Sequence, residues 1–428
     1  MRNSFFKFLI LSLLTILPSF ASPFKLELSA KAAILINSET GAVLYEKNAH
    51  LPLYPASITK MVTALYAIEK RQEALDERIQ APFEAVCAVY PHVRRRSQAH
   101  PPYRLEFGGS HMGIKTGEEL SFRVLLYGLM LVSGNDAANV IAYFVSGSIP
   151  QFIKELNLYV QSKGCKNTEL HTPHGLPYPD HKTTAYDMAL LAREALKQPL
   201  LREIVKTVSY TRPKTHLQPE AIMYQHNALI KPGSKFYYPK AIGIKTGFTN
   251  AGGYTLIAAA EDEERKLVAV LLGCEHLDER YKDAIALFEA AFNEKKVERT
   301  LFSKEFDIFN HAIKGGKTLL KAELKEDTRL SFYESENHHF CSKISWDENP
   351  LPIMQGQNVG KVTIFSREEP LLEVPLFAQH RVEPTLSYLL HSKWQSCKKA
   401  LNSYLGILLA LIGSAIVLGG YFIFHRKV

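Results

Sequence analysis

Cysteine is scarce in this chain, and its scarcity excludes two classes of protein. Five cysteines are scattered over 428 residues, and no Cys-x-x-Cys pair occurs among them. A disulfide-stapled scaffold needs denser and evenly paired cysteines, whereas structural zinc and dithiol redox sites need closely spaced ligand pairs. We therefore expect neither a disulfide framework nor a structural metal.

The chain also lacks a strong excess of charge of either sign. The 51 Lys and Arg residues face 43 Asp and Glu residues, a net charge of +8. Over this length the excess is a mild bias and gives no reason to expect a nucleic-acid partner. A hydrophobic content of 46% with 22% charged residues excludes a disordered chain and a protein with many membrane spans. At roughly 150 residues per domain, the length allows two or three folded units.

The N-terminus has the pattern of a secretory signal peptide. Arg2 and Lys7 precede and flank an apolar run that extends to Phe20, and small residues precede Ser22. A basic start, a short apolar region and a small-residue cleavage site direct export. We expect residues 1–21 to be a cleaved signal peptide. An uncleaved N-terminal anchor is the alternative.

One long uncharged run closes the chain. Residues 404–424 are long enough, at about 1.5 Å per residue, to cross a hydrocarbon core of about 30 Å. We expect a transmembrane anchor at 403–425, after a stalk or interfacial helix at 385–402 and before a cytoplasmic tail at 426–428. A solvated linker at 385–402 is the alternative to the stalk helix. Because the signal peptide directs export, the folded part is expected on the outer, periplasmic side of the cytoplasmic (inner) membrane.

Between the two ends, the pattern of apolar and polar residues changes once. Residues 22–296 mix helical patterns with strand-like runs, including a hairpin pattern at 32–45 and two buried strands joined by EDEER within 254–274. From 297 to 384, short alternating segments are separated by Gly, Asn and Pro, which predicts a small all-β domain. The pattern indicates an α/β (α+β) domain followed by a β-rich one.

The first segment that carries chemistry lies at the start of a predicted helix over 58–71. Ser57 and Lys60 are three residues apart and share one face of that helix. A serine hydroxyl becomes a nucleophile when a nearby base takes its proton, and a lysine is such a base when burial or neighbouring cations lower its pKa. Alone, the same spacing is also typical of a serine that caps a helix.

Two further segments carry reactive residue types. Ser133 and Asn135 lie in a predicted turn, where a hydroxyl and an amide can relay a proton and bind a peptide carbonyl, although an ordinary capped turn has the same residues. Lys-Thr-Gly at 245–247 precedes a strand-like run; its glycine admits a substrate backbone, and its lysine and threonine suit a carboxylate. A second Lys-Thr-Gly, at 115–117, leads into a helical run and is assigned to a loop.

The order of these three segments resembles the penicillin-binding protein and β-lactamase superfamily. The flanks PASITKMVTALYAIE, LVSGNDAANVIA, HTPHGLPYPDHKTTAYDMALLA and IGIKTGFTNAGGYTLIAAA are similar to those of low-molecular-weight serine D-alanyl-D-alanine carboxypeptidases. The resemblance covers about residues 30–296, and 297–384 is similar to that family's second domain. It implies a serine β-lactamase/transpeptidase-like domain in which an antiparallel sheet packs on a helical cluster, with the active site between them.

The resemblance also implies roles for particular residues. Ser57 would attack the carbonyl between two terminal D-alanines, with Lys60 as the base, and Ser133 would pass a proton to the departing D-alanine. Asn135 would bind the substrate amide. Lys245, Thr246 and Gly247 would lie on the strand that binds the terminal carboxylate, with Arg280 beside that carboxylate. The backbone N–H groups of Phe248 and Ser57 would stabilise the oxyanion. No metal or organic cofactor is needed.

We therefore predict a serine DD-carboxypeptidase that removes the terminal D-alanine from peptidoglycan stem pentapeptides and their precursors and that β-lactams inhibit covalently. A DD-endopeptidase that cuts cross-links uses the same residues and stays an alternative. A β-lactamase is disfavoured because residues 174–187 contain no glutamate to activate the deacylating water. A non-catalytic envelope scaffold is disfavoured because it has no need for Ser57 together with Lys60.

One segment departs from the family pattern. Residues 88–110 are longer and more basic than the family leads us to expect, and they include three adjacent arginines at 94–96. We expect an exposed loop here. Contact of these arginines with an anionic envelope polymer is a hypothesis.

Overall fold

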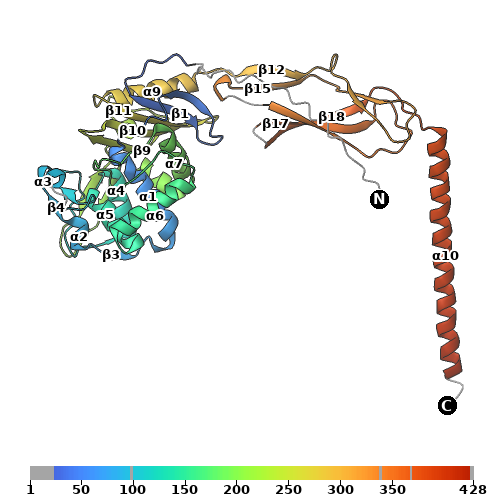
Figure 1. The fold of residues 1–428 in the computed structure, drawn as a ribbon, viewed down its shortest axis with the longest axis horizontal. Coiled ribbons are helices and arrows are strands. Elements are labelled where there is room, and N and C mark those ends of the chain that lie inside the picture. The colour runs from blue at the N-terminus through green and yellow to red at the C-terminus, as the bar shows by residue number, and fades with distance from the viewer. Residues whose placement is uncertain (1–23, 97–99, 337–339, 367–368, 425–428) are drawn as a thin grey trace. The chain divides into compact units, whose positions relative to one another are not determined.

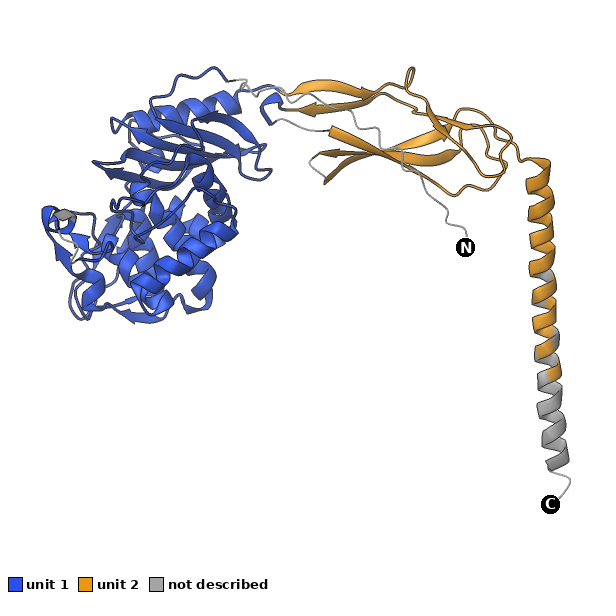
Figure 2. Ribbon diagram, in the orientation of Figure 1, with its two compact units in different colours: residues 1–295, 333–337 blue, residues 296–332, 338–428 orange. Residues whose placement is uncertain are grey.

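The computed structural model describes residues 24–96, 100–336, 340–366 and 369–424. The chain forms two compact units, the larger from residues 1–295 and 333–337 and the smaller from residues 296–332 and 338–428 (Figure 2). The predicted signal peptide at 1–21 and cytoplasmic tail at 426–428 lie outside the described residues, and both stay predictions.

A five-stranded antiparallel sheet forms the centre of the larger unit (Figure 1). In spatial order its strands are β2 (Val43–Lys47), β1 (Ala32–Asn37), β11 (Lys266–Cys274), β10 (Gly253–Glu261) and β9 (Ala241–Thr249). The predicted hairpin is the β1–β2 pair, and the two predicted buried strands are β10 and β11, so both predictions are confirmed.

Helices cover both faces of this sheet. Their bounds are α1 (Thr59–Arg71), α4 (Phe122–Leu131), α5 (Asn135–Ser146), α6 (Ile149–Ser162), α7 (Ala185–Lys197), α8 (Pro199–Lys206) and α9 (Glu279–Phe292). Successive residues of a strand point to opposite faces. Ala33 and Leu35 of β1 accordingly pack with α9, whereas Ile34 and Ile36 pack with the helical cluster around α1. The expected antiparallel sheet with a helical cluster is confirmed.

Short elements complete the larger unit. They are η1 (Ala56–Ile58), η2 (Gln72–Ala74), β3 (Arg78–Gln80), α2 (Phe83–Val86), β4 (Ala88–Val89), α3 (Pro91–Arg96), β5 (Leu105–Glu106), β6 (Glu119–Ser121), β7 (Ser209–Arg212), β8 (Ala221–Tyr224), η3 (Ala228–Ile230) and η4 (Glu334–Glu336). Three strand pairs, β3–β6, β4–β5 and β7–β8, brace the connections around the helices. The Lys-Thr-Gly at 115–117 lies in the loop before β6, as predicted.

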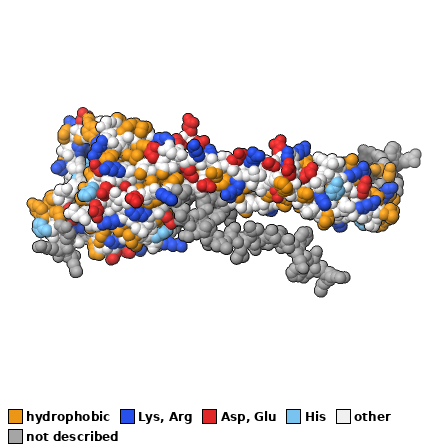
Figure 3. Space-filling view, turned by 90° about the horizontal axis from the view of Figure 1, so that it is seen from above, with side chains coloured by type: hydrophobic (Ala, Val, Ile, Leu, Met, Phe, Trp, Pro, Cys, Tyr) orange, Lys and Arg blue, Asp and Glu red, His pale blue; other side chains and the backbone are white. Residues whose placement is uncertain are grey.

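The basic segment at 88–110 contains the short elements β4, α3 and β5 and a buried arginine. The Arg94 side chain is buried, its guanidinium donates to the Pro177 carbonyl at 3.1 Å, and it pairs with Glu106 at 3.6 Å. The expectation of an exposed arginine was therefore wrong for Arg94, because a buried guanidinium with these partners is a packing group. On the face drawn in Figure 3, cationic and anionic side chains are interspersed over both units.

The smaller unit is all-β up to about residue 384, as predicted. Its strands are β12 (Val297–Phe302), β13 (Phe309–His311), β14 (Leu320–Glu323), β15 (Thr328–Phe332), β16 (Phe340–Trp346), β17 (Asn358–Ser366) and β18 (Glu369–Ala378). They form a two-stranded sheet, β12–β15, and a five-stranded sheet in the order β13-β14-β18-β17-β16. Leu320, Val362 and Leu376 lie in its core.

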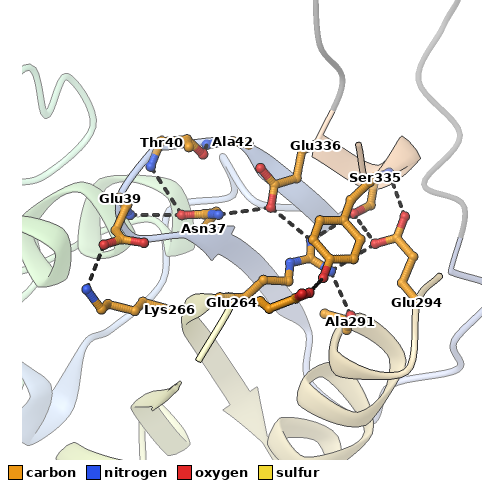
Figure 4. Close-up of polar contacts among 12 residues, drawn as sticks. Asn37, Glu39, Thr40, Ala42, Glu264, Lys266, Ala291, Glu294, Ser335 and Glu336 are labelled. Atoms are coloured by element: carbon orange, nitrogen blue, oxygen red, sulfur yellow. Dashed lines mark hydrogen bonds and ion pairs between the residues drawn. The ribbon is translucent and has the colours of Figure 1, made fainter. Parts of the chain in front are cut away.

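Residues 333–336 follow β15 in the chain but belong to the larger unit. The buried Arg265 guanidinium pairs there with Glu336 at 3.1 Å and with Glu294 at 3.0 Å. Asn37, at the end of β1, donates to the Glu336 carboxylate at 2.9 Å (Figure 4). Because a buried charge needs partners, these contacts hold η4 against β1 and α9.

One helix, α10 (Leu386–Phe424), closes the described chain. It runs without a break through the predicted stalk at 385–402 and into the predicted span at 403–425. Within the part of the chain that the structure describes, no helix is both long and apolar enough to cross a membrane. The structure therefore gives no support to the predicted transmembrane helix, which stays a prediction.

Candidate active site

Ser57 lies in η1, directly before α1, and Lys60 lies in the first turn of α1. The Lys60 ammonium is 2.9 Å from the Ser57 hydroxyl. The turn is strained, because Ala56 has a φ of +52°, a region that costs a non-glycine residue about 1–3 kcal/mol. The neighbouring sheet holds it in place, since the Thr255 hydroxyl of β10 donates to the Pro55 carbonyl at 3.0 Å.

Lys60 is wholly buried and uses all three of its hydrogen-bond donors. Its acceptors are Ser57 Oγ, Asn135 Oδ1 at 2.7 Å and the His174 carbonyl at 2.7 Å. Burial lowers the pKa of Lys60 well below its usual value, and the nearby Lys245 cation lowers it further. A lysine that loses its proton in this position presents its lone pair to Ser57, which is the geometry of a general base.

The turn that holds Ser133 lies between α4 and α5. Ser133 is buried and has a φ of +59°, and Asn135 is the first residue of α5. The Asn135 backbone N–H donates to the Ser110 carbonyl at 2.8 Å, while its side-chain oxygen accepts from Lys60. The second motif therefore positions the lysine of the first, a contact that spacing in the sequence did not indicate.

The Lys-Thr-Gly segment lies on β9, at the edge of the sheet and beside η1, as expected. A bulge precedes it, with φ values of +106° at Gly243 and +111° at Ile244. Bulges re-aim the side chains that follow them. A Cβ on Gly247 would lie 2.9 Å from the Ser57 backbone nitrogen, so glycine is needed where β9 passes the predicted nucleophile.

Two buried cations accompany β9. Burial and the neighbouring Arg280 lower the pKa of Lys245 to about 7. Arg280, from α9, donates to the Gly247 carbonyl at 2.9 Å, so it supports the backbone of the strand. Thr246 is 7% exposed, and Phe248 is half-exposed, with its ring on that of Tyr254 at a centroid distance of 4.3 Å. This cationic edge suits a carboxylate ligand.

His174 is a residue of this network that sequence reasoning did not single out. Its carbonyl accepts from Lys60, and its ring is held at both nitrogens, by the Tyr103 carbonyl at 3.1 Å and the Leu176 backbone N–H at 3.1 Å. Burial and then Lys60 lower the pKa of His174 well below its usual value, so the ring is neutral. The sequence segment HTPHGL, which contains His174, was the feature that could have indicated this residue.

Asp136 was also missed. Its carboxylate accepts the backbone N–H groups of Met112, Gly113 and Ile114 at 2.8, 2.8 and 3.0 Å. It lies in the first turn of α5, where a carboxylate is favourable. Asp136 thereby ties the loop at 110–114 to the start of α5. Its signal was an acidic residue directly after the predicted Ser-x-Asn turn.

Among the residues that the structure describes, no group of three or more His, Cys, Asp or Glu side chains is placed to hold a metal ion. A serine and a lysine in contact at a helix start, beside a Ser-x-Asn turn and an edge Lys-Thr-Gly strand, define the class of penicillin-interacting serine enzymes.

Comparison with known proteins narrows this class. The family model for D-alanyl-D-alanine carboxypeptidase matches residues 19–276, and the model for the C-terminal domain of penicillin-binding protein 5 matches residues 298–384. The chain is 31% identical over 354 residues to D-alanyl-D-alanine carboxypeptidase DacF of Bacillus subtilis, covering 82% of this chain and 85% of that protein. It is 28% identical to DacD of Escherichia coli, covering 83% and 87% of the two chains.

Solved structures agree with these matches. The D-alanyl-D-alanine carboxypeptidase DacD of Francisella tularensis has a TM-score of 0.58 at 23% identity, over 85% of this chain and 96% of that one, which shows the fold. A mutant of the DD-transpeptidase of Streptomyces K15 has a TM-score of 0.54 at 26% identity, over 63% and 99%. The chain belongs to the D-alanyl-D-alanine carboxypeptidase family, peptidase S11, and is a serine-type DD-carboxypeptidase that acts on peptidoglycan.

Proposed function

We propose that this carboxypeptidase works through an acyl-enzyme on Ser57, with Lys60 as the base. The observation that carries the proposal is the contact of 2.9 Å between the Lys60 nitrogen and the Ser57 hydroxyl, at a lysine whose pKa is lowered by burial. A hydroxyl is a weak nucleophile until a base accepts its proton, and here the base is within hydrogen-bond reach.

In the first step, Ser57 Oγ bonds to the carbonyl carbon of the penultimate D-alanine while its proton moves to Lys60. The backbone N–H groups of Ser57 and Phe248 stabilise the oxyanion. The C–N bond then breaks, and Ser133 delivers a proton to the leaving amine of the terminal D-alanine. The Lys60 ammonium gives its proton back to Ser133 and becomes neutral again. In the second step, water attacks the ester and gives up a proton to Lys60; the ester C–O bond breaks, Ser57 Oγ takes that proton, and the shortened peptide is released.

The substrate is held by residues on both sides of the nucleophile. Asn135 binds the peptide amide that precedes the scissile bond. Lys245, Thr246 and Gly247 bind the terminal carboxylate, and Arg280 adds positive charge behind them. An entering carboxylate raises the pKa of Lys245, because an opposite charge favours the ammonium form.

The test compares Ser57→Ala with the wild type in a soluble protein of residues 22–402. The variant is expected to release no D-alanine from a pentapeptide ending in D-Ala-D-Ala and to take no covalent penicillin label, with an unchanged melting temperature. Ser162→Ala, which changes a hydroxyl at the exposed end of α6, is the matched control and keeps both activities. If the Ser57→Ala protein still took a covalent penicillin label, Ser57 would not be the nucleophile.

We infer that the enzyme works on the outer side of the cytoplasmic membrane. The support comes from the sequence alone, which has a signal-peptide pattern at 1–21 and an uncharged run at 404–424. On this proposal, peptidoglycan and β-lactams reach the active site without crossing that membrane.

A further inference from the structure

Three rings gather on the surface of the larger unit beside the active site. Tyr90 and Phe107 have ring centroids 5.1 Å apart, and Tyr90 and His92 have centroids 5.8 Å apart. Tyr90 is 61% exposed and Phe107 is 53% exposed. Single exposed apolar residues are ordinary, whereas grouped ones mark binding surfaces. We call Tyr90, His92 and Phe107 the aromatic cluster.

The backbone beneath the aromatic cluster is firmly held. β4 and β5 pair in parallel, with Val89 opposite Glu106, and the Phe107 N–H donates to the Val89 carbonyl at 2.9 Å. Arg94 joins this backbone to the loop at 171–181 through Glu106 and Pro177. The backbone that carries the rings is therefore ordered before any ligand arrives, which lowers the entropic cost of binding.

The same segment adjoins the catalytic network at two points. Ser110 accepts the Asn135 backbone N–H at 2.8 Å, and a Cβ on Gly109 would lie 3.0 Å from the Asn135 side-chain nitrogen. The Tyr103 carbonyl contacts the ring of His174, whose own carbonyl binds Lys60. Phe107 lies two residues before Gly109, so the aromatic cluster is continuous with the Asn135 side of the site.

We propose that the aromatic cluster is a subsite for the stem-peptide residues that precede D-Ala-D-Ala, and that it makes the enzyme prefer long stem peptides over short ones. The proposal rests on the proposed role of Asn135. If Asn135 binds the amide before the scissile bond, the preceding residues leave the site along 107–110. Aliphatic stems of their side chains pack on the ring faces, and the tyrosine edge stays hydrated.

The test uses two probes, N-acetyl-D-Ala-D-Ala and the free pentapeptide L-Ala-D-Glu-L-Lys-D-Ala-D-Ala. In the double variant Tyr90→Ala/Phe107→Ala, kcat/KM for the pentapeptide should fall about tenfold, a factor in keeping with the loss of two ring contacts, while kcat/KM for the dipeptide stays unchanged. Tyr90→Phe/Phe107→Tyr keeps both rings and should keep the preference. Tyr237→Ala, another exposed aromatic, is the matched control and should leave both values unchanged.

Other outcomes overturn the subsite. An equal loss on both probes, or a lowered melting temperature, means that the rings only stabilise the fold, and no loss on either probe means that they bind nothing. A third probe, the pentapeptide attached to its disaccharide, tests the sugar: a loss seen with this probe alone would place the contact on the sugar and contradict a peptide subsite. A wild-type protein that releases no D-alanine from either probe contradicts the catalytic proposal itself, a result distinct from a lost preference.

Discussion

At the scale of single residues, the proposed chemistry depends on Lys60, whose side chain is buried away from solvent. Lys60 donates to two oxygens besides Ser57 Oγ, and Lys245 raises the cost of its charge. Neither acceptor is a carboxylate, and the nearby Asp136 carboxylate offsets that cost only in part. Lys60 thereby contacts Ser57 of its own motif and Asn135 of the second motif directly. The third motif, on β9, lowers the pKa of Lys60 through the charge of Lys245.

This arrangement predicts how acylation depends on pH. Because the pKa of Lys60 is lowered in the folded protein, the neutral form that accepts the Ser57 proton is present above that pKa and disappears as pH falls through it. The rate of penicillin acylation should therefore fall on the acid side. Stopped-flow measurement of acylation from pH 5 to about 9 gives the profile.

A matched variant isolates the base. Lys60→Arg keeps a cation in the same place but never becomes neutral near physiological pH, so acylation should drop about 10²–10⁴-fold. Lys70→Arg, in the exposed last turn of α1, makes the same exchange away from the site and should change nothing. Near-normal acylation by Lys60→Arg would contradict the role of Lys60.

At the scale of elements, the position of the nucleophile depends on a loop packed against η1. Gly175, in the loop after β-bridge residue Glu169, has a φ of +89°, and a Cβ there would lie 1.9 Å from the Ala56 carbonyl oxygen. The loop also supplies the Pro173 carbonyl, which accepts from Thr63 at 2.6 Å. The loop therefore leaves no room for a side chain at its contact with η1.

Gly175→Ala should displace η1 and lower both acylation and stability. We expect a loss of about 2–4 kcal/mol in the free energy of unfolding and at least about a tenfold loss in acylation rate. Gly164→Ala is the matched control, because Gly164 also has a positive φ, of +84°, but nothing lies within 4 Å of the added Cβ. It should cost about 1 kcal/mol and leave acylation unchanged.

Urea unfolding and penicillin acylation, measured on both glycine variants, separate the two effects. If Gly175→Ala and Gly164→Ala lose the same stability and both acylate normally, the packing of the loop on η1 has no part in placing Ser57. A specific loss in Gly175→Ala assigns the effect to the contact with Ala56, since the two glycines have similar positive φ values.

At the scale of the whole molecule, the proposed anchor decides where the enzyme works. The full chain, expressed in bacteria, should stay in the membrane fraction after high-salt and carbonate washes, because an apolar helix is held by burial and salt screens only charge. A chain ending at residue 384 should be soluble and should keep its D-alanine release. Salt extraction of the full chain would contradict the anchor.

The sequence by itself determined the class of fold and the family. Apolar runs bounded by turn residues indicated β1, β2, β10 and β11, and the order of the Ser-x-x-Lys, Ser-x-Asn and Lys-Thr-Gly segments indicated the D-alanyl-D-alanine carboxypeptidases. Both signals are local, because the period of a strand and the residue types of a motif are written in consecutive residues.

Only the tertiary structure decided which groups meet. Lys60 contacts Asn135 and His174, Arg94 is buried, and residues 333–336 contact Arg265. Each of these features brings together residues far apart in the chain. No periodicity predicts such contacts, since they depend on how whole elements pack and on which buried polar groups find partners. The aromatic cluster beside Asn135 became visible for the same reason.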